Sequence, residues 1–167
     1  MNFQNYFKNK IALITGSGRG IGLEIAKEYL KHGAKVIAID LNTKRLLNLK
    51  NKHRNNILIK KFDLSNLDNF NSFLKKLPKN FQNINILINN AGMKSAENLV
   101  KTDINNLNNL INFNSIKVIE ISRILINFSL KKNKGRIINI GSSLSSHGAV
   151  FRAQGGGSDY SVTKSMV

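Results

Sequence analysis

Short apolar runs alternate with helical patterns along the whole chain, and this alternation restricts the fold more than any other feature of the sequence. Runs with the length and composition of buried strands lie at residues 11–14, 36–39, 57–59, 84–88 and 137–140. Apolar residues three and four positions apart predict helices at 21–31, 43–54, 66–77 and 101–130, the last allowing a break near 112–114. Repeated strand–helix units predict an α/β fold with a doubly wound parallel sheet, because short parallel strands need crossover helices on both faces.

The chain has the size and composition of one ordinary globular domain, spanning residues 1–167. Hydrophobic residues make up 41% of it and charged residues 21%, which is enough apolar material for a core. It contains no cysteine, which excludes a disulfide framework and a thiolate metal site. The three histidines are scattered without ligand spacing, so we expect no metal centre.

The formal net charge is +17, from 26 lysines and arginines against 9 aspartates and glutamates. Such a charge raises the hypothesis of a nucleic-acid partner, whose binding would weaken steeply with salt. The basic residues are spread over most predicted elements instead of forming one stripe with aromatic residues, which favours a solvated surface and no nucleic-acid site. No apolar run approaches about 18 residues and the amino terminus is polar, so we expect a cytoplasmic protein with no membrane partner.

A glycine-rich turn lies between the first predicted strand and the first predicted helix, at residues 15–22 (TGSGRGIG). Gly16, Gly20 and Gly22 fit the spacing G-x-x-x-G-x-G and depart from the generic G-x-G-x-x-G. Missing side chains let the chain turn tightly, and the backbone amides together with the helix N-terminus suit a pyrophosphate. A purely structural turn is the alternative, but the strand before it and the helix after it favour a dinucleotide site.

Asp40 ends the second predicted strand, 18 residues beyond Gly22. A carboxylate at this place can accept hydrogen bonds from an adenosine ribose and repel a 2′-phosphate, which favours NAD over NADP as the cofactor. Arg19, Lys44 and Arg45 can instead pair with a 2′-phosphate, so NADP is not excluded. The alternative for Asp40 is a turn residue or a cap of the next helix.

Tyr160 and Lys164 stand four positions apart in YSVTK (160–164), in what the pattern predicts as the first turn of a helix. One turn of spacing places both groups on one helix face. A neighbouring ammonium favours a phenolate, which suits a phenol to general acid–base chemistry near neutral pH. A solvated helix face is the ordinary explanation for a lone pair of this kind, so the rest of the chain must decide.

Six motifs, taken in order, resemble those of the short-chain dehydrogenase/reductase family, and the resemblance covers nearly the whole chain. They are TGSGRGIG at 15–22, Asp63 with Leu64, NNAG at 89–92, Asn114 in the long helix, NIGSS at 139–143 and YSVTK at 160–164. The resemblance implies a Rossmann-type sheet with strand order 3-2-1-4-5, in which the family's last two strands are absent. It also implies a single NAD(P)-binding domain, incomplete at its carboxyl end.

The resemblance further implies an oxidoreductase that moves hydride between a nicotinamide cofactor and a small carbonyl or alcohol substrate. Tyr160 would exchange a proton with the substrate oxygen, and Lys164 would hold the nicotinamide ribose. Ser142 would bond to the reacting oxygen, with Ser143 as the fallback, and Asn114 would hold a water in the proton relay. The implied catalytic residues are therefore Asn114, Ser142, Tyr160 and Lys164.

The implied cofactor contacts lie at the carboxyl ends of strands, where doubly wound sheets bind their ligands. Asp63 would contact the adenine edge, while Asn90 is expected either to line the adenosine side or to pin neighbouring strands. The cofactor-binding residues implied in this way are Gly16, Ser17, Arg19, Gly20, Ile21, Gly22, Asp40, Asp63, Leu64, Asn90, Ala91, Gly92, Tyr160 and Lys164.

The sequence departs from the family pattern in two places. Ser142 and Tyr160 stand 18 positions apart, a longer gap than is usual, so the segment between them carries an insertion that includes His147 and Arg152. We expect this loop to face the substrate, with Arg152 either solvated or paired with an acidic substrate group. The chain also ends at Val167, whereas members of the family continue through two more strands.

Two hypotheses about function follow from this ending. In the first, the chain is the amino-terminal part of an enzyme whose full-length form is a homo-oligomer. In the second, it is an inactive, truncated cofactor-binding remnant or pseudo-enzyme. Under both, the fifth strand is left as an apolar edge, which favours aggregation and low activity of the chain as written.

Overall fold

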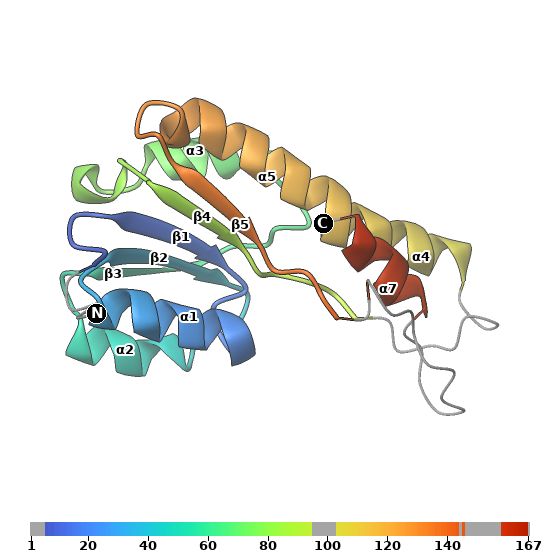
Figure 1. Cartoon of the computed structure of the whole chain (residues 1–167), viewed down its shortest axis with the longest axis horizontal. Coiled ribbons are helices and arrows are strands. Elements are labelled where there is room, and N and C mark those ends of the chain that lie inside the picture. The colour runs from blue at the N-terminus through green and yellow to red at the C-terminus, as the bar shows by residue number, and fades with distance from the viewer. Residues whose placement is uncertain (1–5, 95–102, 144, 146–157, 167) are drawn as a thin grey trace.

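The computed structural model describes residues 6–94, 103–143, 145 and 158–166. Its strands form a parallel sheet in the order β3-β2-β1-β4-β5 (Figure 1), which confirms the predicted α/β fold and strand order. The strands are β1 (Ile11–Thr15), β2 (Lys35–Asp40), β3 (Ile57–Lys61), β4 (Ile86–Asn89) and β5 (Arg136–Asn139). The strand order reverses between β1 and β4, at the kind of position where doubly wound sheets bind ligands.

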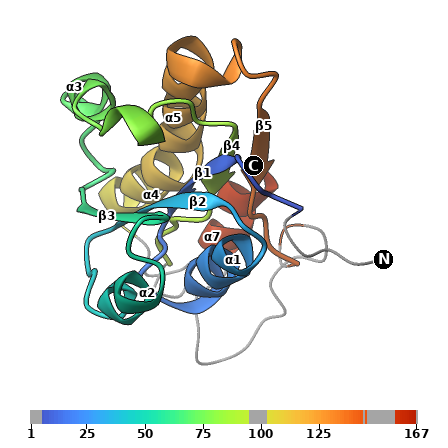
Figure 2. The ribbon, with the colours of Figure 1, turned by 90° about the vertical axis from the view of Figure 1, so that its left-hand side faces the viewer.

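Helices cover both faces of the sheet (Figure 1, Figure 2). One face carries α1 (Gly20–Lys31) and α2 (Leu46–Lys52), and the other carries α3 (Phe70–Lys75) and a long helical stretch. That stretch comprises α4 (Ile104–Ile111), η3 (Asn112–Ile116), α5 (Lys117–Leu125) and η4 (Ile126–Leu130). A 3-10 turn, η1 (Lys79–Phe81), precedes β4, and α7 (Ser158–Ser165) packs on α4 and η3. None of the described helices has the length and apolar character to cross a lipid bilayer.

Alternating side chains of the central strands supply two separate cores. Leu13 and Ile39 point to the face covered by α3 and α5, where Phe70 and Leu125 are fully buried. Neighbouring residues of the same strands point to the opposite face and pack with α1 and α2. Each large apolar side chain buried in this way contributes about 1.5–3 kcal/mol, so the runs that predict the strands also hold the layers together.

Two helices begin later than predicted. The structure starts α2 at Leu46 and α3 at Phe70, whereas the periodicity predicts starts at residues 43 and 66. Asn42 and Asn66 accept hydrogen bonds, through their Oδ1 atoms, from backbone amides two residues further on, at 3.2 and 2.9 Å. Such turns satisfy the backbone outside a helix and so delay its first turn, which periodicity alone does not reveal.

The predicted helix at 101–130 does not break near residues 112–114. In place of a break the structure has a π-helical turn, η3, which accommodates an extra residue while the helix continues. Asn114 and Ser115 lie in this turn and are both buried. Turns of this type are frequent at functional sites, and here the turn contains a residue that the resemblance implies is catalytic. The first two positions of the predicted helix lie outside the described residues.

Among the described strands, β5 forms the edge of the sheet and pairs with β4 alone. All of its residues are exposed, including Ile137 at 37% and Ile138 at 39%. In the described part of the chain, the fifth strand therefore presents the apolar edge that the sequence predicts. Exposed strands of this kind offer unpaired backbone groups to other chains, which is a recognised route to association.

Candidate active site

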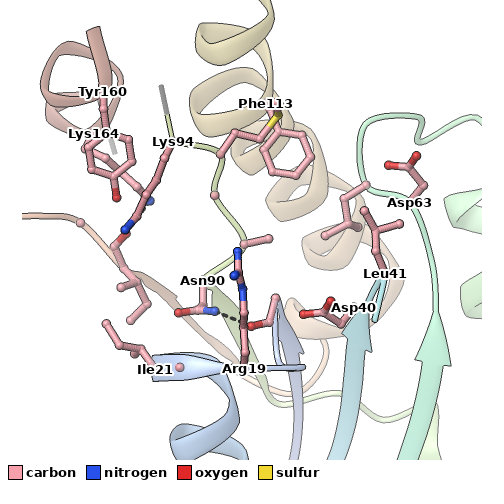
Figure 3. A pocket seen from close by; sticks show the side chains of 18 of the residues that line it. Arg19, Ile21, Asp40, Leu41, Asp63, Asn90, Lys94, Phe113, Tyr160 and Lys164 are labelled. Carbon is pink, nitrogen blue, oxygen red and sulfur yellow. Dashed lines mark hydrogen bonds between the residues drawn. The ribbon is translucent and has the colours of Figure 1, made fainter. Parts of the chain in front are cut away.

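A cleft of about 590 Å³ opens at the carboxyl ends of the described strands (Figure 3). We name its two ends by their residues. The glycine end comprises the turn after β1 with Asp40 and Asp63, and the tyrosine end comprises Lys94, Tyr160 and Lys164. The structure brings the following predicted residues together along the wall: Gly16, Arg19, Gly20, Ile21, Asp40, Asp63, Leu64, Asn90, Ala91, Gly92, Tyr160 and Lys164.

The geometry of the turn requires its predicted glycines. Gly16 and Gly20 have φ angles of +63° and +53°, in the left-handed region that residues with a Cβ atom disfavour. A Cβ atom on Gly22 would lie 2.3 Å from the carbonyl oxygen of Gly16. One on Gly16 would lie 2.7 Å from the Cα atom of Ala91, so the turn packs directly against the segment that follows β4.

Gly18 is a further essential glycine, which the spacing argument missed. A Cβ atom on it would lie 2.2 Å from the carbonyl oxygen of Asn42. Its backbone amide donates a 2.7 Å hydrogen bond to Oδ2 of Asp40, and the amide of Asn42 donates to Oδ1 at 2.9 Å. Asp40 therefore joins the glycine turn to the end of β2 and also lines the cleft. It does not cap α2, whose N-cap position is Arg45.

The N-terminus of α1 lies at the glycine end. Its N-cap residue, Arg19, makes no capping hydrogen bond through its side chain, and no acidic residue lies in the first turn. Helices usually begin with Ser, Thr, Asp or Asn, because the first amides lack acceptors within the helix and the helix dipole is positive there. A guanidinium beside uncapped amides favours an anion such as a phosphate group.

Asp63 and Leu64 follow β3 and line the glycine end. The backbone amide of Ser65 donates a 2.9 Å hydrogen bond to Oδ1 of Asp63, and this bond lowers the pKa of Asp63 below its ordinary value. The carboxylates of Asp40 and Asp63 are thus both at the glycine end. There they can accept hydrogen bonds from hydroxyl or amino groups of a ligand.

Asn90 braces the glycine turn. Its Nδ2 atom donates to the carbonyl oxygens of Thr15 and Gly16, at 3.1 and 2.8 Å. The backbone amides of Asn90 and Ala91 both donate to Oγ1 of Thr15 at 3.0 Å. These bonds tie the end of β1 to the end of β4, as the second of the two expectations for Asn90 describes. The side chain also borders the cleft, so both expectations fit its position.

Tyr160 and Lys164 lie one turn apart on α7 and both line the tyrosine end, as their spacing predicts (Figure 3). Lys164 is buried, and its ammonium donates a 2.8 Å hydrogen bond to the carbonyl oxygen of Ile140, directly after β5. Burial lowers the pKa of Lys164, because removal from water disfavours its charged form. An ammonium has three donors, so two are left for a ligand.

Asn114 is fully buried and is not among the residues that line the cleft. Its Oδ1 atom accepts a 2.8 Å hydrogen bond from the amide of Met93. Its Nδ2 atom donates to the carbonyl oxygen of Met93 and to Oγ1 of Thr163, both at 3.0 Å. Ser115 adds a 3.0 Å bond to the carbonyl oxygen of Thr163. Asn114 therefore ties the segment after β4 to α7, one residue from Lys164.

Two other predicted residues, Ser17 and Gly22, belong to the glycine turn but are buried. Ser17 is fully buried, and its Oγ atom donates a 3.2 Å hydrogen bond to the carbonyl oxygen of Ile39. Gly22 is buried in the first turn of α1. Neither residue lines the cleft, so each shapes the turn from within.

Ser142 is half-buried and, like Ser143, is not among the cleft-lining residues. The carbonyl oxygen of Ser142 accepts a 3.1 Å hydrogen bond from the amide of Ser145. The structure therefore places the predicted serine beside the cleft and does not bring it into the wall. His147, Arg152 and the glycines at 155–157 lie outside the described residues.

The structure adds cleft residues that were not among the predicted site residues, although Ile140 and Gly141 lie within the motif at 139–143. Most of them directly follow a strand end or a motif residue, and this position was the signal that could have found them. Phe113 had no such signal, because it reaches the cleft from the π-helical turn. The added residues are Leu41, Phe62, Met93, Lys94, Phe113, Ile140 and Gly141.

The residues present fit a nicotinamide dinucleotide. Left-handed glycines and the uncapped start of α1 leave the backbone open to a pyrophosphate, and beyond the adjoining backbone no atom of the described residues lies within 4 Å of the place of a Cβ atom on Gly20. The cleft volume falls within the range of about 300–1,000 Å³ that is usual for small-molecule sites. In the described part of the chain, no three His, Asp or Glu side chains gather as a set of metal ligands.

The family model described as short chain dehydrogenase matches residues 10–167, and the chain therefore belongs to this family. The match confirms the resemblance carried by the six motifs. It covers the glycine turn, the segment after β4 and the Tyr160–Lys164 pair within one alignment.

Among curated proteins, the NADP-dependent 3-hydroxy acid dehydrogenase YdfG of Escherichia coli is 33% identical over 158 residues, covering 94% of this chain and 62% of that protein. The 3-oxoacyl-[acyl-carrier-protein] reductase FabG of Escherichia coli is 30% identical over 161 residues, covering 95% and 63%. A solved short chain dehydrogenase from Burkholderia cenocepacia, in complex with NADP, has a TM-score of 0.83 at 25% identity, covering 96% and 64%. The chain thus spans less than two thirds of the length of these relatives.

Proposed function

We propose that this chain forms the cofactor-binding and catalytic part of an NAD(P)-dependent oxidoreductase. It moves hydride between a nicotinamide cofactor and a small carbonyl or alcohol substrate, with Tyr160 as general acid or base. The observation that carries the proposal is that the glycine turn, Tyr160 and Lys164 share one cleft. Membership of the family, and relatives whose names describe a dehydrogenase and a reductase, support the same class of reaction.

In this proposal the bound nicotinamide supplies or accepts the hydride. Tyr160 gives a proton to the substrate oxygen in reduction and takes one from the alcohol in oxidation. The carbonyl oxygen of Ile140 holds the ammonium of Lys164 in the wall, and the other donors of Lys164 bind the nicotinamide ribose.

Asn114 and Ser142 have supporting roles in this proposal. Both N–H groups of the Asn114 amide and one acceptor site of its oxygen are used by Met93 and Thr163. A relay water can therefore bond only to the second acceptor site of Oδ1. Ser142 bonds to the reacting oxygen from its position beside the cleft.

The test follows the absorbance of reduced nicotinamide for the wild type and for Tyr160→Phe. The substitution removes the hydroxyl and keeps the ring, so kcat should fall about 10²–10⁴-fold while the affinity for the cofactor changes little. Equal rates in the two proteins would contradict the role of Tyr160. Cofactor binding without hydride transfer by the wild type would favour the alternative, an inactive truncated remnant or pseudo-enzyme.

We also propose that the cofactor is NAD, with NADP as the competing cofactor. Asp40 places a carboxylate at the glycine end, which disfavours a 2′-phosphate. Arg19 lines the same end and favours a 2′-phosphate, and the names of relatives that state NADP dependence support this alternative.

Titration of NADH and NADPH against the wild type and Asp40→Asn tests the choice, because asparagine keeps the size of the side chain and removes its charge. The proposal expects the wild type to bind NADH about tenfold more tightly, with this preference lost in the variant. If Asp40→Asn binds both cofactors more weakly by the same factor, the substitution has damaged the hydrogen bond with Gly18. The cofactor preference of the wild type then decides between NAD and NADP. Tighter binding of NADPH by the wild type would overturn the proposal.

A further inference from the structure

Charge is distributed unevenly along the cleft. Among its described lining residues, the carboxylates Asp40 and Asp63 both lie at the glycine end (Figure 3). The tyrosine end has two ammonium groups, those of Lys94 and Lys164. A ligand that reaches Tyr160 therefore meets positive charge from the described side chains.

The two lysines at the tyrosine end differ in their contacts. Lys164 is buried, and its ammonium already donates to the carbonyl oxygen of Ile140. Lys94 is exposed, and no carboxylate in the described part of the chain forms an ion pair with it. A lysine is a compact point charge with three donors on a flexible stem, which suits one anionic group of a ligand.

Hydrogen bonds to the buried Asn114 fix the backbone at the base of Lys94. The preceding residue, Met93, bonds to Asn114 through both its amide and its carbonyl group, and Asn114 bonds to Thr163 on α7. Gly92 lies so close to Lys164 that a Cβ atom on it would be 3.5 Å from Nζ of that lysine. The start of the Lys94 side chain is therefore held at a set distance from the helix that carries Tyr160.

We propose that Lys94 binds a carboxylate of the substrate and so selects hydroxy acids and oxo acids over neutral alcohols and ketones. The inference rests on the proposed function, because it orients the reacting carbon towards Tyr160. In oxidation, the C–H bond breaks as hydride passes to the oxidised nicotinamide, and the O–H proton passes to Tyr160 as the C=O bond forms. The carboxylate held by Lys94 is unchanged.

The phosphates of the cofactor have other partners. Arg19 and the uncapped N-terminus of α1 supply positive charge at the glycine end. Lys94 is therefore left for the substrate. The alternative is that Lys94 contacts the cofactor. In that case Lys94→Met should lose affinity for the cofactor and keep its preference among substrates.

The experiment compares 3-hydroxybutyrate with its neutral methyl ester as substrates of the whole chain. Lys94→Met keeps most of the length of the side chain and removes its charge, and Lys94→Arg keeps the charge. Lys75→Met, at an exposed lysine on α3, controls for the change in net charge. For each protein the values of kcat and KM for both compounds and the Kd for NADH are measured.

We expect Lys94→Met to lose the preference for the acid by about ten- to hundredfold through a higher KM, as the loss of one hydrogen bond to a charged group predicts. Lys94→Arg should retain most of the preference, and Lys75→Met should retain all of it. The ester and the Kd for NADH should be unaffected. An unchanged acid preference in Lys94→Met, or a weaker Kd for NADH with the preference intact, would overturn the inference.

Binding of butyrate and butyramide to the protein–NAD complex separates this inference from the proposed function. Neither compound carries a hydroxyl group to oxidise, so the measurement does not require hydride transfer. Tighter binding of butyrate that is lost in Lys94→Met supports the anion site even where the wild type oxidises neither substrate. Equal binding of the two compounds by the wild type rejects the site, whatever the catalytic result.

Discussion

Backbone that leaves no room for side chains builds the glycine end of the cleft, with Asp40 and Asn90 bonded to it, whereas side chains of two helical segments build the tyrosine end. At the glycine end, the carboxylate of Asp40 accepts a hydrogen bond from the backbone of Gly18, and bare backbone is needed because a Cβ atom would collide. At the tyrosine end, Asn114 reaches Thr163, 49 positions away. The first depends on close backbone packing that only glycine allows, and the second on hydrogen bonds of the buried Asn114 side chain.

This difference implies that the two ends fail in different ways. The glycine turn has no room for a methyl group, so even an added alanine side chain should lower its stability strongly. The tyrosine end is held by hydrogen bonds of a buried side chain, so its stability should fall when a donor or acceptor is removed, because the partner group is then left without a hydrogen bond. The two ends should also respond to pH in separate ranges, since one contains a carboxylate with a lowered pKa and the other a lysine with a lowered pKa.

The largest effect is expected for Gly22→Ala. The new Cβ atom would lie 2.3 Å from the carbonyl oxygen of Gly16 and 2.4 Å from Nδ2 of Asn90, so the turn must move. We expect the free energy of unfolding to fall by about 3 kcal/mol or more and binding of NADH to be lost. Urea unfolding and fluorescence titration measure the two quantities.

Gly20→Ala is the matched control for that substitution. Apart from the adjoining backbone, no atom in the described part of the chain lies within 4 Å of its Cβ position, so the cost is limited to the left-handed φ of +53°, about 1–2 kcal/mol. If Gly22→Ala were tolerated as well as Gly20→Ala, the glycine end would not depend on close backbone packing.

The second effect is expected for Asn114→Ala at the tyrosine end. The substitution removes three hydrogen bonds of a fully buried side chain and leaves groups of Met93 and Thr163 without their partner, so we expect a loss of about 2–4 kcal/mol. Amide hydrogen exchange in α7 should accelerate together with the loss of stability. Ser115→Ala removes a single bond to the same helix and should cost about 1 kcal/mol. Unchanged amide hydrogen exchange in α7 after Asn114→Ala would show that Asn114 does not hold α7 against the segment after β4.

A smaller effect concerns stability at alkaline pH. Burial lowers the pKa of Lys164, so between its folded and unfolded pKa values the unfolded state binds more protons than the folded state. Stability therefore rises with pH through this window, towards the unfolded pKa of 10.5. Each unit of lowering is worth about 1.4 kcal/mol. Urea unfolding at several pH values should show the rise in the wild type and in Lys75→Met, and its absence in Lys164→Met is the decisive comparison.

The smallest effect concerns stability at acid pH. The amide of Ser65 lowers the pKa of Asp63, so the stabilisation is complete above the unfolded value of 3.8 and is lost as pH falls through the lower folded value. Thermal unfolding of Asp63→Asn should show a shallower loss of stability on acidification than the wild type. Asp68→Asn removes another exposed carboxylate and is the control. If stability falls with pH in the same way in the two variants, Asp63 does not contribute to the loss of stability in acid.

Local spacing explains why much of the fold and part of the site could be predicted. Apolar runs gave the strands and their order followed from the family resemblance, while Tyr160 and Lys164 lie four positions apart on one helix. Gly18 could not be found in this way, because its need for a bare backbone comes from Asn42 on a different loop. Likewise, spacing cannot show that Lys94 shares a cleft with Tyr160.

The same reasoning applies to the elements that were predicted with wrong limits. The side chains of Asn42 and Asn66 accept hydrogen bonds from backbone amides two residues further on, and these turns delay the starts of α2 and α3. The spacing of apolar residues does not reveal such bonds. The π-helical turn keeps Asn114 in a continuous helix where periodicity suggested a break. The cytoplasmic location and the homo-oligomeric full-length form stay predictions.

The central claim is that one dinucleotide binds along the cleft from the glycine end to the tyrosine end. Backbone amide chemical shifts of the isotope-labelled chain, recorded with and without NADH, test it most directly. We predict changes at residues 16–22, at Asp40, at 90–92 and at Lys164, and none in the groove between α3 and α5 that is lined by Lys75 and Arg123. Changes confined to that groove, or changes at the glycine end with none at Lys164, would contradict the claim.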